Sequence, residues 1–170
     1  LPEGVFNVLP GMGAEVGRAL ASSMDVAALL FTGSTAVGKL LMGYAAQSNL
    51  KAVALECGGK SANIVLRDVV DMDLAVEATA MGVFQNQGQI CNAATRLLLD
   101  APIHDDFVER LLAFTAKLAP GDPLDPATRF GSLVGDAHAD RVRAHVAAGE
   151  AEGAFRLTPS GGDCPPGLRP

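Results

Sequence analysis

The sequence lacks tryptophan and has a single tyrosine, Tyr44, among its 170 residues. A surface that stacks nucleic-acid bases needs more aromatic side chains than this. Basic residues are also few, since 13 Lys and Arg stand against 19 Asp and Glu, and they are scattered along a chain of net charge −6. These shortages argue against nucleic acid and against an anionic membrane surface as partners.

Long apolar runs and paired cysteines are missing as well. The longest apolar runs, such as VAALLF at residues 26–31, are far too short to span a bilayer. No export signal is visible at the start of the sequence. The three cysteines, Cys57, Cys91 and Cys164, are odd in number and widely spaced. We therefore expect a reduced, cytoplasmic setting.

What the sequence does contain is enough apolar surface for a core, at 49% hydrophobic and 19% charged residues. Apolar runs alternate with segments of helical period, which predicts an α/β fold with mainly parallel strands. Strands are expected at 5–10, 26–32, 51–56, 61–66 and 95–100, and helices at 14–23, after Ser34, from Asp71, and over 104–118 and 138–153.

Two glycine loops have spacings close to phosphate-binding motifs, and only the second is expected to bind an anion. GMGAEVG (11–17) has the spacing G-x-G-x-x-x-G, one residue longer than the dinucleotide fingerprint, and we interpret it as a turn into a helix. GSTAVGKL (33–40) matches the phosphate loop of nucleotide hydrolases, with Asp100 as a candidate magnesium ligand, except that Leu40 replaces the hydroxyl residue. This loop can still bind an anion at a helix N-terminus.

Two further stretches carry candidate chemistry. In LECGGKSA, Glu56 stands at the end of a predicted strand, where α/β proteins place their reactive groups. In FQNQGQICNAAT (84–95), Cys91 stands among amide side chains with no histidine within ten positions. The three histidines are predicted to lie on charged helix faces with poor spacing for a metal, so no metal site is expected.

In this order and at these intervals, FTGSTAVGK, LECGGKSANIV and FQNQGQICNA resemble the NAD(P)-dependent aldehyde dehydrogenase superfamily. The wording GGKSANIV, NQGQICNAATRLLLD and PLDPAT…HAD is most similar to the γ-glutamyl-γ-aminobutyraldehyde dehydrogenases. The resemblance implies part of a Rossmann-like cofactor domain, residues 1–58, followed by part of the α/β catalytic domain, residues 59–170.

The resemblance also implies roles for individual residues. Cys91 corresponds to the nucleophile that attacks the aldehyde, and Glu56 to the general base that activates Cys91 or the hydrolytic water. The implied cofactor is NAD or NADP, with NAD favoured, and the implied cofactor-binding residues are Gly33, Ser34, Thr35, Val37, Gly38 and the backbone of Cys57. The implied lining of the aldehyde tunnel is Gln85, Ile90 and Asn92, of which two are polar, as suits an aldehyde with amine or amide groups.

Members of the superfamily are much longer than this chain, so we expect it to be a piece of a longer polypeptide with little activity by itself. The complete enzyme would be a homodimer or homotetramer acting on a small aldehyde. Two alternatives remain open from the residues alone. One is a phosphate-loop nucleotide hydrolase, and the other is a non-catalytic dinucleotide-binding fragment in which Cys91 is no more reactive than Cys164.

Overall fold

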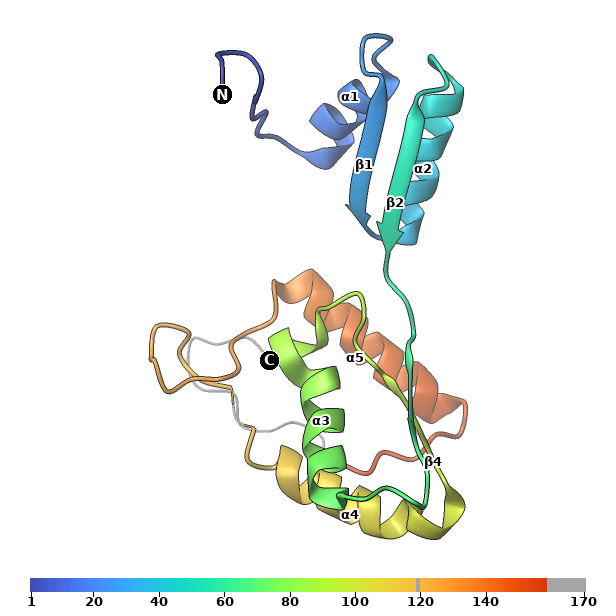
Figure 1. Ribbon diagram of the computed structural model, residues 1–170, viewed down its shortest axis with the longest axis vertical. Helices are drawn as coiled ribbons and strands as arrows, with labels where there is room; N and C mark the ends of the chain where they lie inside the picture. Colours follow the sequence, from blue (N-terminus) through green and yellow to red (C-terminus); the bar gives the residue numbers. More distant parts are fainter. Residues whose placement is uncertain (119, 159–170) are drawn as a thin grey trace. The chain divides into compact units, whose positions relative to one another are not determined.

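The computed structural model describes residues 1–118 and 120–158, and the chain forms two compact units, residues 1–58 and 59–170 (Figure 1). Each unit is built around a pair of parallel strands joined through a helix. Parallel strands require such a crossover connection, because a short turn cannot bring the chain back to the starting edge. The predicted α/β fold class is thereby confirmed, and both pairs of strands are parallel.

The first unit contains a β–α–β crossover preceded by short helical turns. A π-helical turn, η1 (Gly13–Gly17), leads into α1 (Arg18–Ser22). Strand β1 (Ala28–Gly33), helix α2 (Thr35–Ala46) and strand β2 (Ala52–Cys57) follow. The register places Ala28 opposite Ala52 and Gly33 opposite Cys57, so both strands end at the same edge of the sheet.

Only one face of this two-stranded sheet is covered within the unit. Helix α2 packs against β2, and α1 packs against α2, where Ala21, Leu41 and Ala45 are buried. Side chains along each strand alternate between half-buried and exposed, as the period of two requires. Leu30 belongs to the uncovered set and is 81% exposed.

A buried lysine fastens the two helices of the first unit together. Lys51 is only 6% exposed, and its Nζ donates to the carbonyl oxygen of Ala21 at 2.5 Å and to Oγ of Ser48 at 2.9 Å. The neighbouring Asn49 donates from Nδ2 to the carbonyl oxygen of Val26 at 3.0 Å. The segment between α2 and β2 therefore holds both the end of α1 and the entry to β1.

The second unit pairs β3 (Ala62–Val65) with β4 (Arg96–Leu99). Between them run helix α3 (Met72–Phe84) and the turn η2 (Gln85–Gly88), and after them come η3 (Ala101–Ile103), α4 (His104–Thr115) and α5 (Asp136–Ala151). Asp71 caps α3, because its Oδ1 accepts from the backbone N–H of Leu74 at 2.9 Å. In Figure 1, α3 and α4 pack side by side.

The core of the second unit lies where α3 and α4 meet the sheet. Val65, Val76 and Phe107 are buried there, and Phe107 has no exposed surface. An ion pair closes the carboxyl end of the sheet, since Arg67 contacts both carboxylate oxygens of Asp100, at 2.5 and 3.0 Å. That carboxylate was the candidate magnesium ligand of the nucleotide hydrolase interpretation, and an arginine holds it instead.

Most of the expected elements are present, with one clear exception. The strands predicted from 26, 51, 61 and 95 are confirmed within two residues at each end, and so is the helix capped by Ser34. The strand predicted at 5–10 is wrong, because those residues form turns and irregular backbone. A strand needs a hydrogen-bonded neighbour, which periodicity alone does not supply. Within the described ranges, no helix is long and apolar enough to cross a membrane.

Candidate active site

The first part of the candidate site is the loop between β1 and α2. Ser34 caps α2 with extended backbone, and its Oγ accepts from the N–H of Val37 at 3.2 Å. The first turn of an α-helix leaves its leading N–H groups without intrahelical partners and carries partial positive charge. Gly33, Ser34 and Thr35 are all exposed here, so the loop fits the phosphates of a dinucleotide.

A side chain would be crowded at two glycines here, Gly33 in the loop and Gly38 in the first part of α2. A Cβ on Gly33 would lie 2.4 Å from the ring of Phe31. A Cβ on Gly38 would lie 3.2 Å from Leu55 and 3.4 Å from the sulfur of Cys57, so Gly38 lets α2 approach β2 closely. The loop therefore keeps its position because the helix behind it is packed directly on the strand.

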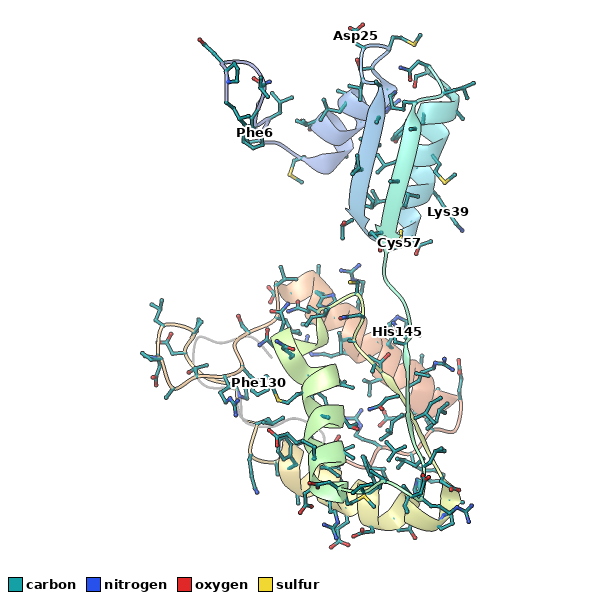
Figure 2. All side chains as sticks on the ribbon, in the orientation of Figure 1. Phe6, Asp25, Lys39, Cys57, Phe130 and His145 are labelled. Carbon is teal, nitrogen blue, oxygen red and sulfur yellow. The ribbon has the colours of Figure 1, made fainter. Side chains whose placement is uncertain are left out.

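The end of β2 brings Glu56 and Cys57 to the same edge of the sheet as this loop. Thr32 lies opposite Glu56 in the register, and Gly33 lies opposite Cys57. Glu56 is exposed, whereas Cys57 is half-buried, with its sulfur toward α2. In Figure 2, Cys57 lies at the end of β2 and Lys39 projects from α2. The side chain of Cys57 thus packs against α2, while its backbone lies at the edge of the sheet that also bears the loop before α2.

The second part of the candidate site is the turn that follows α3 in the second unit. Asn86, Gln87 and Gly88 have positive φ angles of 50°, 56° and 72°, so three successive residues are left-handed. For a residue with a side chain this costs about 1–2 kcal/mol. Cys91 follows this turn and is exposed as a free thiol. Strained backbone of this kind is concentrated at functional sites.

Gly59 lies against the loop that bears Cys91. A Cβ added to Gly59 would come within 3.9 Å of the carbonyl oxygen of Cys91. The loop itself is held to α3 by the N–H of Ala94, which donates to the carbonyl oxygen of Gly82 at 3.2 Å. The segment after Gly58 and the loop that bears Cys91 are thus neighbours within the second unit.

The remaining candidate residues are the three expected to line the aldehyde tunnel and the third cysteine. Gln85 and Asn92 are exposed and Ile90 is half-buried, and their role as substrate lining stays a prediction. Cys164 lies outside the described residues. In the parts of the chain that are described, no group of three or more His, Cys, Asp and Glu side chains could hold a metal ion.

Two further residues of the same loop, Gln87 and Gln89, were not among the site residues predicted from the sequence. Their side-chain amides bond to backbone groups of residues 131–134, far along the chain. The stretch 84–95 is rich in amide side chains, but this composition does not indicate which groups they bond. The structure shows that the bonded groups are the N–H groups of Gly131 and Val134.

Comparison with known proteins identifies the class to which this fold and these motifs belong. The profile of the Aldehyde dehydrogenase family matches residues 1–169. The chain therefore belongs to the aldehyde dehydrogenase family, and the predicted resemblance is confirmed. The alternative of a phosphate-loop nucleotide hydrolase is not supported.

Individual relatives are similar at about half of the aligned positions. The NADP/NAD-dependent aldehyde dehydrogenase PuuC of Escherichia coli (strain K12) is 50% identical over 157 residues, which are 92% of this chain and 32% of PuuC. The aminoacetaldehyde dehydrogenase of Pseudomonas aeruginosa is 48% identical over 146 residues, 86% of this chain and 29% of that protein. The chain thus spans about a third of the length of these relatives.

A solved structure shows the same fold. The γ-glutamyl-γ-aminobutyraldehyde dehydrogenase from Burkholderia cenocepacia J2315 superposes with a TM-score of 0.86 at 50% identity, covering 89% of this chain and 30% of that one. At this identity the likeness covers sequence as well as fold. A γ-glutamyl-γ-aminobutyraldehyde dehydrogenase, the group that the motifs GGKSANIV and NQGQICNAATRLLLD resemble, is therefore among the similar structures.

Proposed function

We propose that this chain belongs to an enzyme that oxidises an aldehyde to a carboxylic acid with NAD(P)+ through a covalent intermediate on Cys91. Membership of the family together with an exposed Cys91 thiol on a strained loop supports this proposal. We also propose that residues 1–170 act within a longer polypeptide, called the full-length polypeptide below. Residues 1–58 would serve its cofactor domain and residues 59–170 its catalytic domain.

The proposed reaction begins with the thiolate of Cys91. Its sulfur attacks the carbonyl carbon of the aldehyde and forms a thiohemiacetal, whose oxyanion accepts from the backbone N–H of Cys91. A bound NAD(P)+ supplies the acceptor for the hydride that leaves this carbon. The carbon then remains on sulfur as a thioester, because loss of hydride restores the carbonyl group.

Glu56 would complete the cycle as a general base. It would take a proton from water as the water attacks the thioester, and the carbon–sulfur bond then breaks to release the carboxylic acid and the thiolate of Cys91. Membership of the aldehyde dehydrogenase family supports this role for Glu56.

The cofactor would be held by residues of the first unit. Gly33, Ser34 and Thr35 would hold the phosphates at the N-terminus of α2, with Val37 beside the adenine and Gly38 permitting the close packing of the helix. The backbone of Cys57 would face the nicotinamide end. The cofactor would be NAD or NADP, with NAD favoured.

The substrate class follows from the side chains beside the nucleophile. Gln85 and Asn92 are polar and exposed, so we propose an aldehyde that carries an amine or amide group. Two similar proteins bear names of aminated aldehydes, aminoacetaldehyde in one and γ-glutamyl-γ-aminobutyraldehyde in the other. We propose further that the enzyme is cytoplasmic. We also propose that it forms a homodimer or homotetramer, and light scattering on the full-length polypeptide would measure this oligomeric state.

The decisive experiment measures aldehyde-dependent reduction of NAD+ and NADP+ by the full-length polypeptide. Cys91→Ala should abolish it, whereas Cys57→Ala should retain it, because that sulfur packs against α2. Glu56→Gln should slow turnover by about 100- to 10,000-fold, the range of general base catalysis. Iodoacetamide should label Cys91 faster than Cys57 or Cys164. Equal activity of Cys91→Ala and wild type would refute the proposed function.

A further inference from the structure

We propose that Gln87 and Gln89 are positioning residues that fix the backbone of Cys91 by fastening its loop to residues 131–134. We call residues 131–134 the support segment. The inference rests on the proposed function, because it assigns a purpose to the position of the thiol. Neither glutamine is required to touch the aldehyde or the cofactor.

The loop before Cys91 needs side-chain contacts to hold it because its backbone is left-handed. Asn86 and Gln87 both have left-handed φ and ψ angles, at 50° and 37° and at 56° and 32°. Asparagine tolerates this region, whereas glutamine enters it seldom. A left-handed turn of this kind persists only where surrounding contacts hold it. Gly88 continues it at a φ of 72°.

The two glutamine side chains supply those contacts in the same manner. Oε1 of Gln89 accepts from the N–H of Val134 at 3.0 Å. The Gln87 amide is assigned in the orientation that satisfies both of its ends, in which Oε1 accepts from the N–H of Gly131 at 2.8 Å. The amide nitrogens of both side chains donate to the carbonyl oxygen of Asn86, each at 3.3 Å. Each amide thus joins the left-handed turn to the support segment.

The support segment is itself anchored. It follows Phe130, which is only 7% exposed and whose carbonyl oxygen accepts from the N–H of Gly121 at 2.8 Å. Phe130 is labelled in Figure 2. The support segment precedes α5, whose first turn contains the buried Ala139. A glutamine bonded to this segment is therefore bonded to the framework of the second unit.

The link to chemistry is the short distance along the chain. Cys91 follows Gln89 by two residues, so a shift of the turn moves the thiol and the backbone N–H proposed to bind the oxyanion. A displacement of about 1 Å in a reacting group can cost on the order of 100-fold in rate. The hydrogen bonds of Gln87 and Gln89 would prevent such a shift.

The test uses matched variants of the full-length polypeptide. Gln89→Met removes the acceptor while keeping the length of the side chain. Val134→Pro removes the donor from the other side, and Val134→Ala keeps it, since the exposed Val134 side chain takes no part. Gln47→Met, an exposed glutamine on the first unit, is the control for the substitution itself. Turnover is expressed per Cys91 thiol that is titrated.

We expect Gln89→Met and Val134→Pro to lower kcat by about 10- to 100-fold, with the KM for NAD+ unchanged. Val134→Ala and Gln47→Met should match wild type. The Gln89→Met/Val134→Pro double variant should be no slower than Gln89→Met alone, because Gln89→Met already removes the hydrogen bond that Val134→Pro removes. Residues 86–93 should exchange amide hydrogens faster in Gln89→Met.

The outcomes separate this inference from the proposed function. An active wild type and an inactive Cys91→Ala, with kcat of Gln89→Met within twofold of wild type, would overturn the positioning role alone. A wild type that oxidises no aldehyde would overturn both. If Val134→Pro does not fold, Gln89→Met and its hydrogen exchange decide the question.

Discussion

At the scale of single residues, the first unit depends on a charge in an unusual place. An ammonium group can be buried only when its N–H groups are hydrogen-bonded. Lys51 meets this condition with the carbonyl oxygen of Ala21 and the hydroxyl of Ser48. The carbonyl belongs to the last turn of α1, where partial negative charge gathers. Lys51 therefore links the end of α1 to the segment that follows α2 and adds to the direct packing of the two helices.

We expect Lys51→Met to loosen α1 from α2. The substitution keeps the length of the side chain but leaves the buried carbonyl of Ala21 without its partner, at a cost of about 1–3 kcal/mol. Hydrogen exchange of peptides that cover residues 18–27 should therefore become faster in the full-length polypeptide. Lys39→Met, which alters an exposed lysine on α2, should leave that exchange unchanged. Equal protection in both variants would contradict the role of Lys51.

Single residues also show where sequence reasoning stops. Glu56 and Cys91 stand out because motifs of fixed wording surround them, and their catalytic roles stay predictions. Gln87, Gln89 and Lys51 do not stand out, since their partners lie 30 or more residues away in the chain. A short motif contains the side chain but not the backbone group that it bonds. Contacts of this kind need the fold.

At the scale of secondary-structure elements, the second unit is closed by a charge pair at the carboxyl end of β3 and β4. Arg67 follows β3 and Asp100 follows β4, and the guanidinium contacts both carboxylate oxygens. The hydrogen bond from Arg67 holds the pKa of Asp100 below its ordinary value. The pair thus joins the two strands at the point where their backbone pairing ends.

The lowered pKa of Asp100 predicts the direction of a pH effect. A carboxyl whose folded-state pKa lies below its unfolded value stabilises the fold above the unfolded pKa, and this contribution is lost as pH falls through the folded pKa. We therefore expect β3 and β4 to lose protection in acid, below about pH 4. In Arg67→Leu the carboxyl of Asp100 should titrate near its ordinary value in an NMR experiment. An unchanged titration would show that Arg67 is not the cause.

Two helices were predictable from the sequence because each begins at a clear cap. Helix α2 begins after Ser34 and α3 after Asp71 because each side chain accepts from an N–H in the first turn. The apolar run at 5–10 has no such local determinant, and it forms no strand. Local chemistry thus defined the helices, while the pairing of strands depended on distant partners.

At the scale of the whole molecule, the chain has the fold class and family that the sequence predicted, but its two units carry uncovered apolar faces. Among residues 1–118 and 120–158 each sheet has two strands, and sheets usually need three or more strands or a packed layer on the open side. Leu30 in β1, Ile64 in β3 and Leu98 in β4 are 81%, 64% and 47% exposed. Exposed apolar residues gathered on one face usually mark a surface that another segment covers.

We therefore expect residues 1–170, produced alone, to oxidise aldehydes with little or no activity and to bind the dye ANS. Leu30→Lys should reduce ANS fluorescence of this chain, because it places charge on the open face of the β1–β2 sheet. The same substitution should lower the stability of the full-length polypeptide if that face is covered there, since a charge would then be buried without a partner. Opposite effects of one substitution in the two settings would identify the face as an internal surface. An active chain of 170 residues, or a Leu30→Lys variant that is neutral in both settings, would show that each unit is sufficient as it stands.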